Sequence, residues 1–101
     1  MKNITVQELN TKIQQGQKLV LLDVREDHER AEFNIGGIHI PLGKVQSFQL
    51  EQIEDHKNDE VVVYCRSGRR SMMAGMMLEQ IGFTDVANLE GGMLAWQEAK
   101  L

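Results

Sequence analysis

The stretch VVVYCRSGRRS (residues 61–71) joins a run of β-branched residues to the only cysteine of the chain and then to a basic segment that contains glycine. The first half, with Glu60 before it, predicts a strand that is covered on both faces. In an open α/β sheet, ligands bind at the carboxyl ends of the strands, and Cys65 lies at such an end, just before a predicted helix. We therefore expect Cys65 to mark a functional site.

Strands and helices are predicted to alternate along the rest of the chain. Thr5 and Glu8 form a capping-box pattern before a helix over residues 6–15, which Gly16 ends. The apolar run LVLLDV (19–24) predicts a second strand that is covered on both faces. The other predicted elements are a short helix over 26–33, a strand over 38–40, a helix through Val45, Phe48, Leu50 and Ile53, a helix from Arg70 to Ile81, a strand over 86–89 and a helix from Gly91 through Trp96.

This alternation predicts the α/β class, with a mostly parallel central sheet between helices on both faces. The length of 101 residues, with 42% hydrophobic and 26% charged residues, is ordinary for one globular domain, and we expect a single domain over residues 1–101.

Net charge and the number of cysteines exclude several classes of protein and indicate the compartment. The net charge of −4 argues against a general nucleic-acid or acidic-membrane binder, since such proteins carry an excess of Lys and Arg. A single cysteine excludes an intramolecular disulfide framework and a cysteine-based zinc cluster, and it fits a reducing compartment. The first residues show no signal or membrane-spanning segment. We therefore expect a soluble cytoplasmic protein.

The loop after Cys65 has the chemistry of an anion cradle. Gly68 permits a backbone conformation that other residues resist, so that successive N–H groups can point inward as a nest. The nest, the helix N-terminus and the arginines favour a thiolate and predict a lowered pKa for Cys65. Such a thiolate is a nucleophile without a neighbouring base. A small buried structural cysteine is the simpler interpretation, but three clustered arginines would then only repel each other.

Loop length separates two kinds of cysteine chemistry. Phosphatases that form a phosphocysteine need Cys-x5-Arg, but the sixth residue after Cys65 is Ser71, and an arginine comes one position earlier. Here the sequence resembles the rhodanese family of sulfurtransferases over nearly its whole length. The matching pieces, in the family's order, are LLDVRE (21–26), EFNIGGIHIPL (32–42), VVVYCRSGRRS (61–71), LEQIGF (78–83) and VANLEGGMLAW (86–96).

The resemblance implies a three-layer rhodanese-like domain in which Cys65 takes the outer sulfur of a donor such as thiosulfate and passes it, as a persulfide, to a thiophilic acceptor. That acceptor would be cyanide, a small thiol or a protein thiol. Neither a metal nor a cofactor is expected. Asp23 and Arg25 resemble the family's Asp-Val-Arg element, which supports the architecture near the loop, and Trp96 resembles a packing tryptophan. The residues expected to bind the persulfide and the anionic donor are Arg66, Ser67, Gly68, Arg69 and Arg70.

One segment departs from the commonest pattern of the family. Where many members read Gly-His-Ile-Pro-Gly-Ala, this chain has FNIGGI over residues 33–38. This form resembles rhodanese domains attached to adenylating enzymes of sulfur-cofactor pathways, and it favours a sulfur relay over cyanide detoxification.

Two other functions stay open on sequence grounds. One is a noncatalytic module that docks a partner or senses oxidants through its thiol. The other is a phosphatase or arsenate reductase of related fold, which the short loop disfavours.

Other tempting features have simpler interpretations. The three histidines have no metal-ligand spacing, and the segment EDHERAE (26–32) is expected to be a solvated helix face. Four methionines within residues 72–77 are expected to form mainly a core stripe, with Met72 or Met76 contributing an apolar rim for a protein partner.

Overall fold

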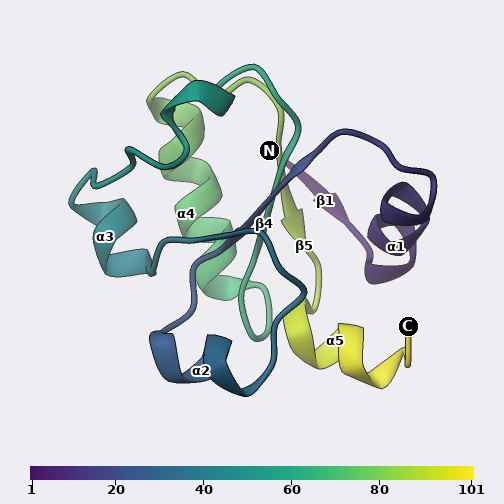
Figure 1. The fold of residues 1–101 in the computed structure, drawn as a ribbon. Helices are drawn as coiled ribbons and strands as arrows, with labels where there is room; N and C mark the ends of the chain where they lie inside the picture. The colour runs from purple at the N-terminus through teal and green to yellow at the C-terminus, as the bar shows by residue number, and fades with distance from the viewer.

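Five strands form one all-parallel sheet in the computed structural model, which describes residues 1–101 (Figure 1). Their order across the sheet is β1-β5-β4-β2-β3. The strands are β1 (Lys2–Ile4), β2 (Val20–Asp23), β3 (Ile38–His39), β4 (Val61–Tyr64) and β5 (Val86–Leu89). The helices are α1 (Val6–Gln14), α2 (Asp27–Glu32), α3 (Leu42–Gln46), α4 (Arg69–Gln80) and α5 (Gly92–Glu98), with a 3₁₀ turn at Glu54–His56. The predicted α/β class is confirmed.

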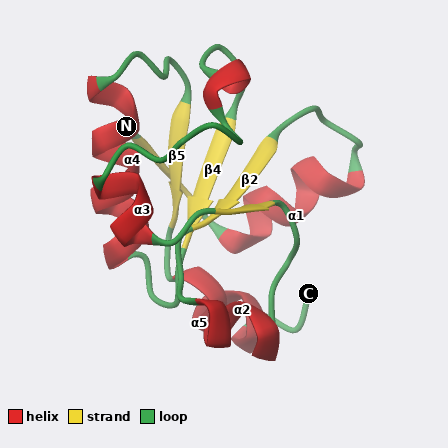
Figure 2. Ribbon diagram, turned by 60° about the vertical axis from the view of Figure 1, so that its left-hand side comes forward, coloured by secondary structure: helices red, strands yellow, loops and turns green.

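The central strand β4 separates two apolar cores. Val61 and Val63 point to the side of α3 and α4, whereas Val62 and Tyr64 point to the side of α1 and α5. Figure 2 shows α3 and α4 on one side of the sheet and α1 on the other. All four residues of β4 are buried, as expected for a strand covered on both faces. The predicted capping box of α1 is also present.

Two elements differ from the prediction. Strand β1 was not expected, because its residues KNI are mostly polar, and two of the three are exposed on the edge next to β5. The helix expected through Ile53 ends at Gln46, since Phe48 adopts a φ of +58°, which a helix does not accommodate. Phe48 is 61% exposed. Leu50 and Ile53 are buried nevertheless, from the loop and turn that follow α3.

The methionines of α4 do not form the expected core stripe. The helix turns its small residues toward the sheet: Ser71, Ala74 and Gly75 are buried together with Leu78. A Cβ on Gly75 would lie 3.3 Å from Val86 Cγ1, so this face lies close to β5. The opposite face carries Met72, Met73 and Met76, which are 43–53% exposed, while Met77 packs partly against the core.

None of the helices is long and apolar enough to cross a membrane. The cytoplasmic location stays a prediction.

Candidate active site

Cys65 directly follows β4 and is 1% exposed, at the carboxyl end of the central strand. The chain then turns through Gly68, whose φ of +102° is unfavourable for other residues, and α4 begins at the next residue. The start of α5 lies against the same backbone, since the N–H of Met93 donates to the carbonyl oxygen of Cys65 at 2.9 Å. A Cβ on Gly92 would lie 2.4 Å from that oxygen, so this position requires glycine.

Two backbone donors and one hydroxyl oxygen surround the sulfur. The backbone N–H groups of Gly68 and Ser71 donate to Sγ at 3.1 and 3.4 Å, and the Ser71 hydroxyl oxygen lies 3.3 Å from it. Burial alone raises the pKa of the Cys65 thiol, but hydrogen bonds from Ser71 and from backbone N–H groups of the loop outweigh it and lower that pKa. The site can therefore hold a thiolate, or another sulfur anion, away from water.

Sequence reasoning missed a buried polar group next to this sulfur. The Ser71 hydroxyl donates to Oδ1 of Asn88 on β5, and both residues are at most 2% exposed. The amide nitrogen of Asn88 donates to the carbonyl oxygen of Gly68 at 3.1 Å. The asparagine within the apolar strand VANL could have indicated this contact from the sequence, because buried polar side chains form hydrogen bonds.

The loop arginines take different places. Arg66 and Arg69 are exposed, and neither forms an ion pair. Arg70 instead forms two hydrogen bonds of 2.7 Å with Glu29 of α2, and these lower the pKa of Glu29 to about 2. The segment EDHERAE is thus more than a solvated face, since Glu29 anchors the loop across 41 residues of sequence. Ser67 is exposed between Arg66 and Gly68.

Asp23 and Arg25 lie beside the loop at the end of β2. Asp23 is opposite Tyr64 in the sheet register, one residue from Cys65. The Arg25 guanidinium donates twice to the Asp23 carboxylate, both times at 2.9 Å, and it lies 5.4 Å from the centre of the Tyr64 ring. Burial raises the pKa of Asp23, but the hydrogen bonds from Arg25 outweigh it and lower that pKa. A further bond of 2.7 Å to the carbonyl oxygen of Phe33 ties α2 to this pair.

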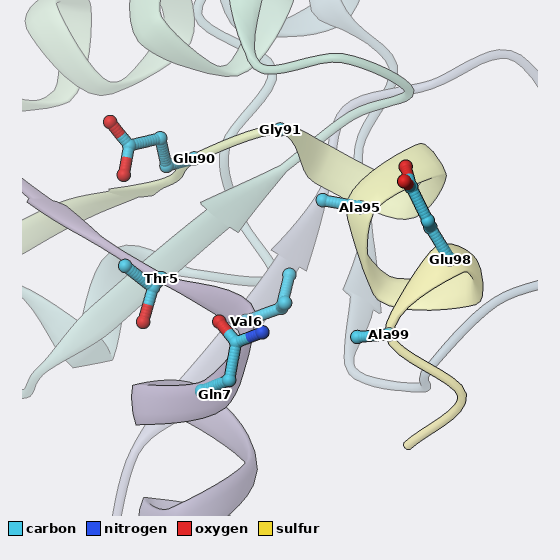
Figure 3. Close-up of a pocket in the computed structure, with 8 residues that line it drawn as sticks. All are labelled: Thr5, Val6, Gln7, Glu90, Gly91, Ala95, Glu98 and Ala99. Carbon is cyan, nitrogen blue, oxygen red and sulfur yellow. The ribbon is translucent and has the colours of Figure 1, made fainter.

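Two hollows are present on the surface, and Cys65 lines neither of them. The smaller, of about 210 Å³, adjoins the loop and is lined by Arg66, Arg25, Leu94 and five neighbours. The larger, of about 490 Å³, lies between the starts of α1 and α5. Figure 3 shows Ala95 and Ala99 facing Val6 and Gln7 there, with the carboxylates of Glu90 and Glu98 at its edge. It holds no cysteine, and its one hydroxyl, that of Thr5, accepts a hydrogen bond from the N–H of Glu8 in the capping box of α1, so the site around Cys65 is the better candidate.

No three His, Cys, Asp or Glu side chains are grouped so that they could hold a metal ion. His39 donates to the carbonyl oxygen of Arg25 at 2.7 Å, and His56 lies 2.8 Å from the carboxylate of Asp59. Trp96 packs against the core on the α1 and α5 side of the sheet.

Comparisons with known proteins agree on one family. A family model described as "Rhodanese-like domain" matches residues 5–99. The Bacillus subtilis protein with the name "Putative sulfurtransferase YtwF" is 42% identical over 96% of this chain and 91% of its own length. A protein of Allochromatium vinosum named "Sulfurtransferase" is 32% identical over 95% of this chain and 88% of its own. The crystal structure of a rhodanese-like domain protein from Staphylococcus aureus superimposes with a TM-score of 0.83 at 34% identity, over 95% of this chain and 91% of that one.

Proposed function

The chain belongs to the rhodanese family, and on this premise we propose that it is a sulfurtransferase that carries a sulfane sulfur on Cys65. The observation that carries the proposal is the environment of that thiol. It lies at the carboxyl end of the central strand, where two backbone N–H groups donate to the sulfur and its pKa is lowered. Residues 1–101 would act as one domain.

Loading follows from attack by the Cys65 thiolate on the outer sulfur of thiosulfate. A bond forms between Sγ and that sulfur, the S–S bond of thiosulfate breaks, and its electron pair leaves with sulfite. The product is a Cys65 persulfide anion. The N–H groups of Gly68 and Ser71, which already face Sγ, would help to hold the charge of the anion.

In the discharge step, Sγ of Cys65 is the leaving group, whereas in the loading step it is the nucleophile. A thiophilic acceptor attacks the outer sulfur of the persulfide, the bond to Sγ breaks, and its electron pair returns to Cys65 as a thiolate. With cyanide the product is thiocyanate, and with a thiolate it is a new persulfide. Since Cys65 is 1% exposed, the acceptor must reach the sulfur with a slender group, which suits cyanide, a small thiol or a cysteine on a protein partner.

The loop arginines have separate roles in this proposal. Arg66 and Arg69, both exposed and without an ion pair, would attract the anionic donor. Arg70 would mainly position the loop, because its guanidinium is held by Glu29. Ser67 and Gly68 would contribute backbone N–H groups.

Removing either exposed guanidinium should weaken the use of anionic donors. We expect Arg66→Ala and Arg69→Ala each to raise KM for thiosulfate about two- to fivefold, the value of one exposed charge contact. KM for an uncharged persulfide donor should change little. Steady-state kinetics with both donors at two salt concentrations would test this, with Lys18→Ala as control, since that lysine is 87% exposed and lies outside the site. Equal losses with both donors would assign the arginines a structural role instead.

Intact mass spectrometry tests the proposed function directly. After brief exposure to thiosulfate, the protein should gain the mass of one sulfur atom and lose it again on addition of cyanide. Because the chain has one cysteine, protein alkylated with iodoacetamide is the matched control and should gain nothing. If neither thiosulfate nor a direct persulfide donor adds sulfur, the thiol does not turn over and the noncatalytic module becomes the better function.

The geometry does not favour a phosphatase. The sixth residue after Cys65 is Ser71, which is buried with its hydroxyl oxygen 3.3 Å from the sulfur, and the preceding Arg70 is bound to Glu29. Hydrolysis of para-nitrophenyl phosphate that depends on Cys65 would reverse this conclusion.

A further inference from the structure

The buried amide of Asn88 has a defined orientation. Its nitrogen lies 3.1 Å from the carbonyl oxygen of Gly68, and a carbonyl oxygen can only accept a hydrogen bond. The nitrogen must therefore be on that side, and Oδ1 must face the Ser71 hydroxyl. Asn88 is 2% exposed and Ser71 fully buried, so no solvent competes for these contacts.

The orientation of the Asn88 amide determines where the Ser71 hydroxyl hydrogen points. A hydroxyl has a single hydrogen, and Oδ1 of Asn88 can only accept, so the Ser71 hydroxyl donates to Asn88. Its oxygen, 3.3 Å from Sγ, then accepts from the Cys65 thiol. We propose that Asn88 is a positioning residue that turns the Ser71 hydroxyl away from the sulfur in the thiol state, and that the hydroxyl turns back to donate to the sulfur when Cys65 carries a negative charge.

The switch of the Ser71 hydroxyl from Asn88 to the sulfur would assist the discharge of the persulfide, a consequence that rests on the proposed sulfurtransferase function. In the persulfide, Sγ is bonded to the outer sulfur and bears no full charge, so the hydroxyl stays with Asn88. When an acceptor takes the outer sulfur, the electron pair of the broken bond collects on Sγ. The hydroxyl can then donate to the leaving thiolate, at the expense of its bond to Asn88.

The charged groups around the sulfur do not replace this contact. From α4, the Arg70 cation interacts electrostatically with Cys65, but its guanidinium is held by Glu29 of α2. At the end of β2, the buried carboxylate of Asp23 is bound to Arg25. Arg30 is bound to Asp23, and His39 is bound to the carbonyl oxygen of Arg25. The other titratable or charged side chains on and beside these elements are exposed: Arg66, Arg69, Glu26, Asp27, His28, Glu32, Lys44, Glu79, Glu90 and Glu98. None of them forms a hydrogen bond with Ser71 or Asn88.

A double-mutant cycle isolates the proposed effect. The pH profile of the rate of alkylation by iodoacetamide reports the pKa of Cys65 in wild type, Asn88→Ala, Ser71→Ala and the double variant. Without Asn88, the hydroxyl is free to donate to the thiolate, so the midpoint should fall by about half a pH unit or more. In the Ser71→Ala background, the same change should leave the midpoint where it was, because no hydroxyl remains to be released.

A purely structural role of Asn88 would give a different result. Loss of its bond to Gly68 would loosen the loop and raise the midpoint in both backgrounds. The proposal is overturned if Asn88→Ala leaves the midpoint unchanged, raises it, or shifts it equally in both backgrounds. Asn88→Leu, which is close to asparagine in volume and offers no acceptor to the Ser71 hydroxyl, serves if the alanine variant does not fold by circular dichroism. Alkylation needs no sulfur donor, so this outcome is separate from the persulfide test.

Discussion

Replacing Cys65 by serine is expected to abolish sulfur loading and to reduce turnover with thiosulfate by a factor on the order of 10³ or more. The donors around Sγ suffice to lower the pKa of a thiol, but an alcohol is a far weaker acid and needs an adjacent general base to become a nucleophile. No such base contacts the sulfur, whose hydrogen-bond partners are the N–H groups of Gly68 and Ser71 and the Ser71 hydroxyl. Steady-state assay of thiocyanate or sulfite release would measure the loss.

The serine variant also separates chemistry from folding. The exchange removes little volume from a residue that is 1% exposed, so the melting temperature should stay close to that of the wild type. Wild type alkylated with iodoacetamide provides a second protein without a nucleophile. If Cys65→Ser keeps more than about a tenth of the turnover while folded, another group transfers the sulfur and the mechanism proposed for Cys65 is wrong.

Much of the fold could be predicted because its central strands are buried on both faces. The runs that became β2 and β4 are almost wholly apolar, and the capping box of Thr5 and Glu8 marks the start of α1. Strand β1 lacks such a pattern. It forms because its backbone pairs with β5 at the edge of the sheet, and its mostly polar side chains do not indicate that pairing. The prediction of a methionine core stripe was wrong because α4 carries small residues where it approaches the sheet, and three of its methionines face outward.

The candidate site could be predicted only as far as it is local in sequence. Cys65, the glycine turn and the basic residues lie within one loop, and their relation to a strand end can be inferred from the pattern. The groups that arrive from elsewhere could not be placed: Glu29, which binds Arg70, is 41 residues away, and Asn88, which binds Ser71, is 17 residues away. Local spacing carries no information about such pairings. Only the structure therefore shows that Arg70 is bound to Glu29 and that Arg66 forms no ion pair.

The supporting pair at the end of β2 carries the second large effect that we expect. Asp23 is fully buried and accepts hydrogen bonds from the backbone N–H and the guanidinium of Arg25, which is itself 4% exposed. Asp23→Ala would leave a buried guanidinium without its carboxylate, although the bond to Phe33 remains. Breaking one side of a buried pair costs about 3–5 kcal/mol of the free energy of unfolding. Urea unfolding followed by circular dichroism should show this loss.

An exposed pair on the same sheet provides the matched control. Lys2 and Asp85 form an ion pair of 3.1 Å with side chains that are 53% and 45% exposed, so Asp85→Ala should cost no more than about 1 kcal/mol. The double variant Asp23→Ala with Arg25→Leu should recover part of the loss, because it removes the unpaired charge from the core. If Asp23→Ala costs no more than Asp85→Ala, the pair contributes little to stability. Its role would then be limited to orienting α2, and with it Glu29, toward the loop that holds Cys65.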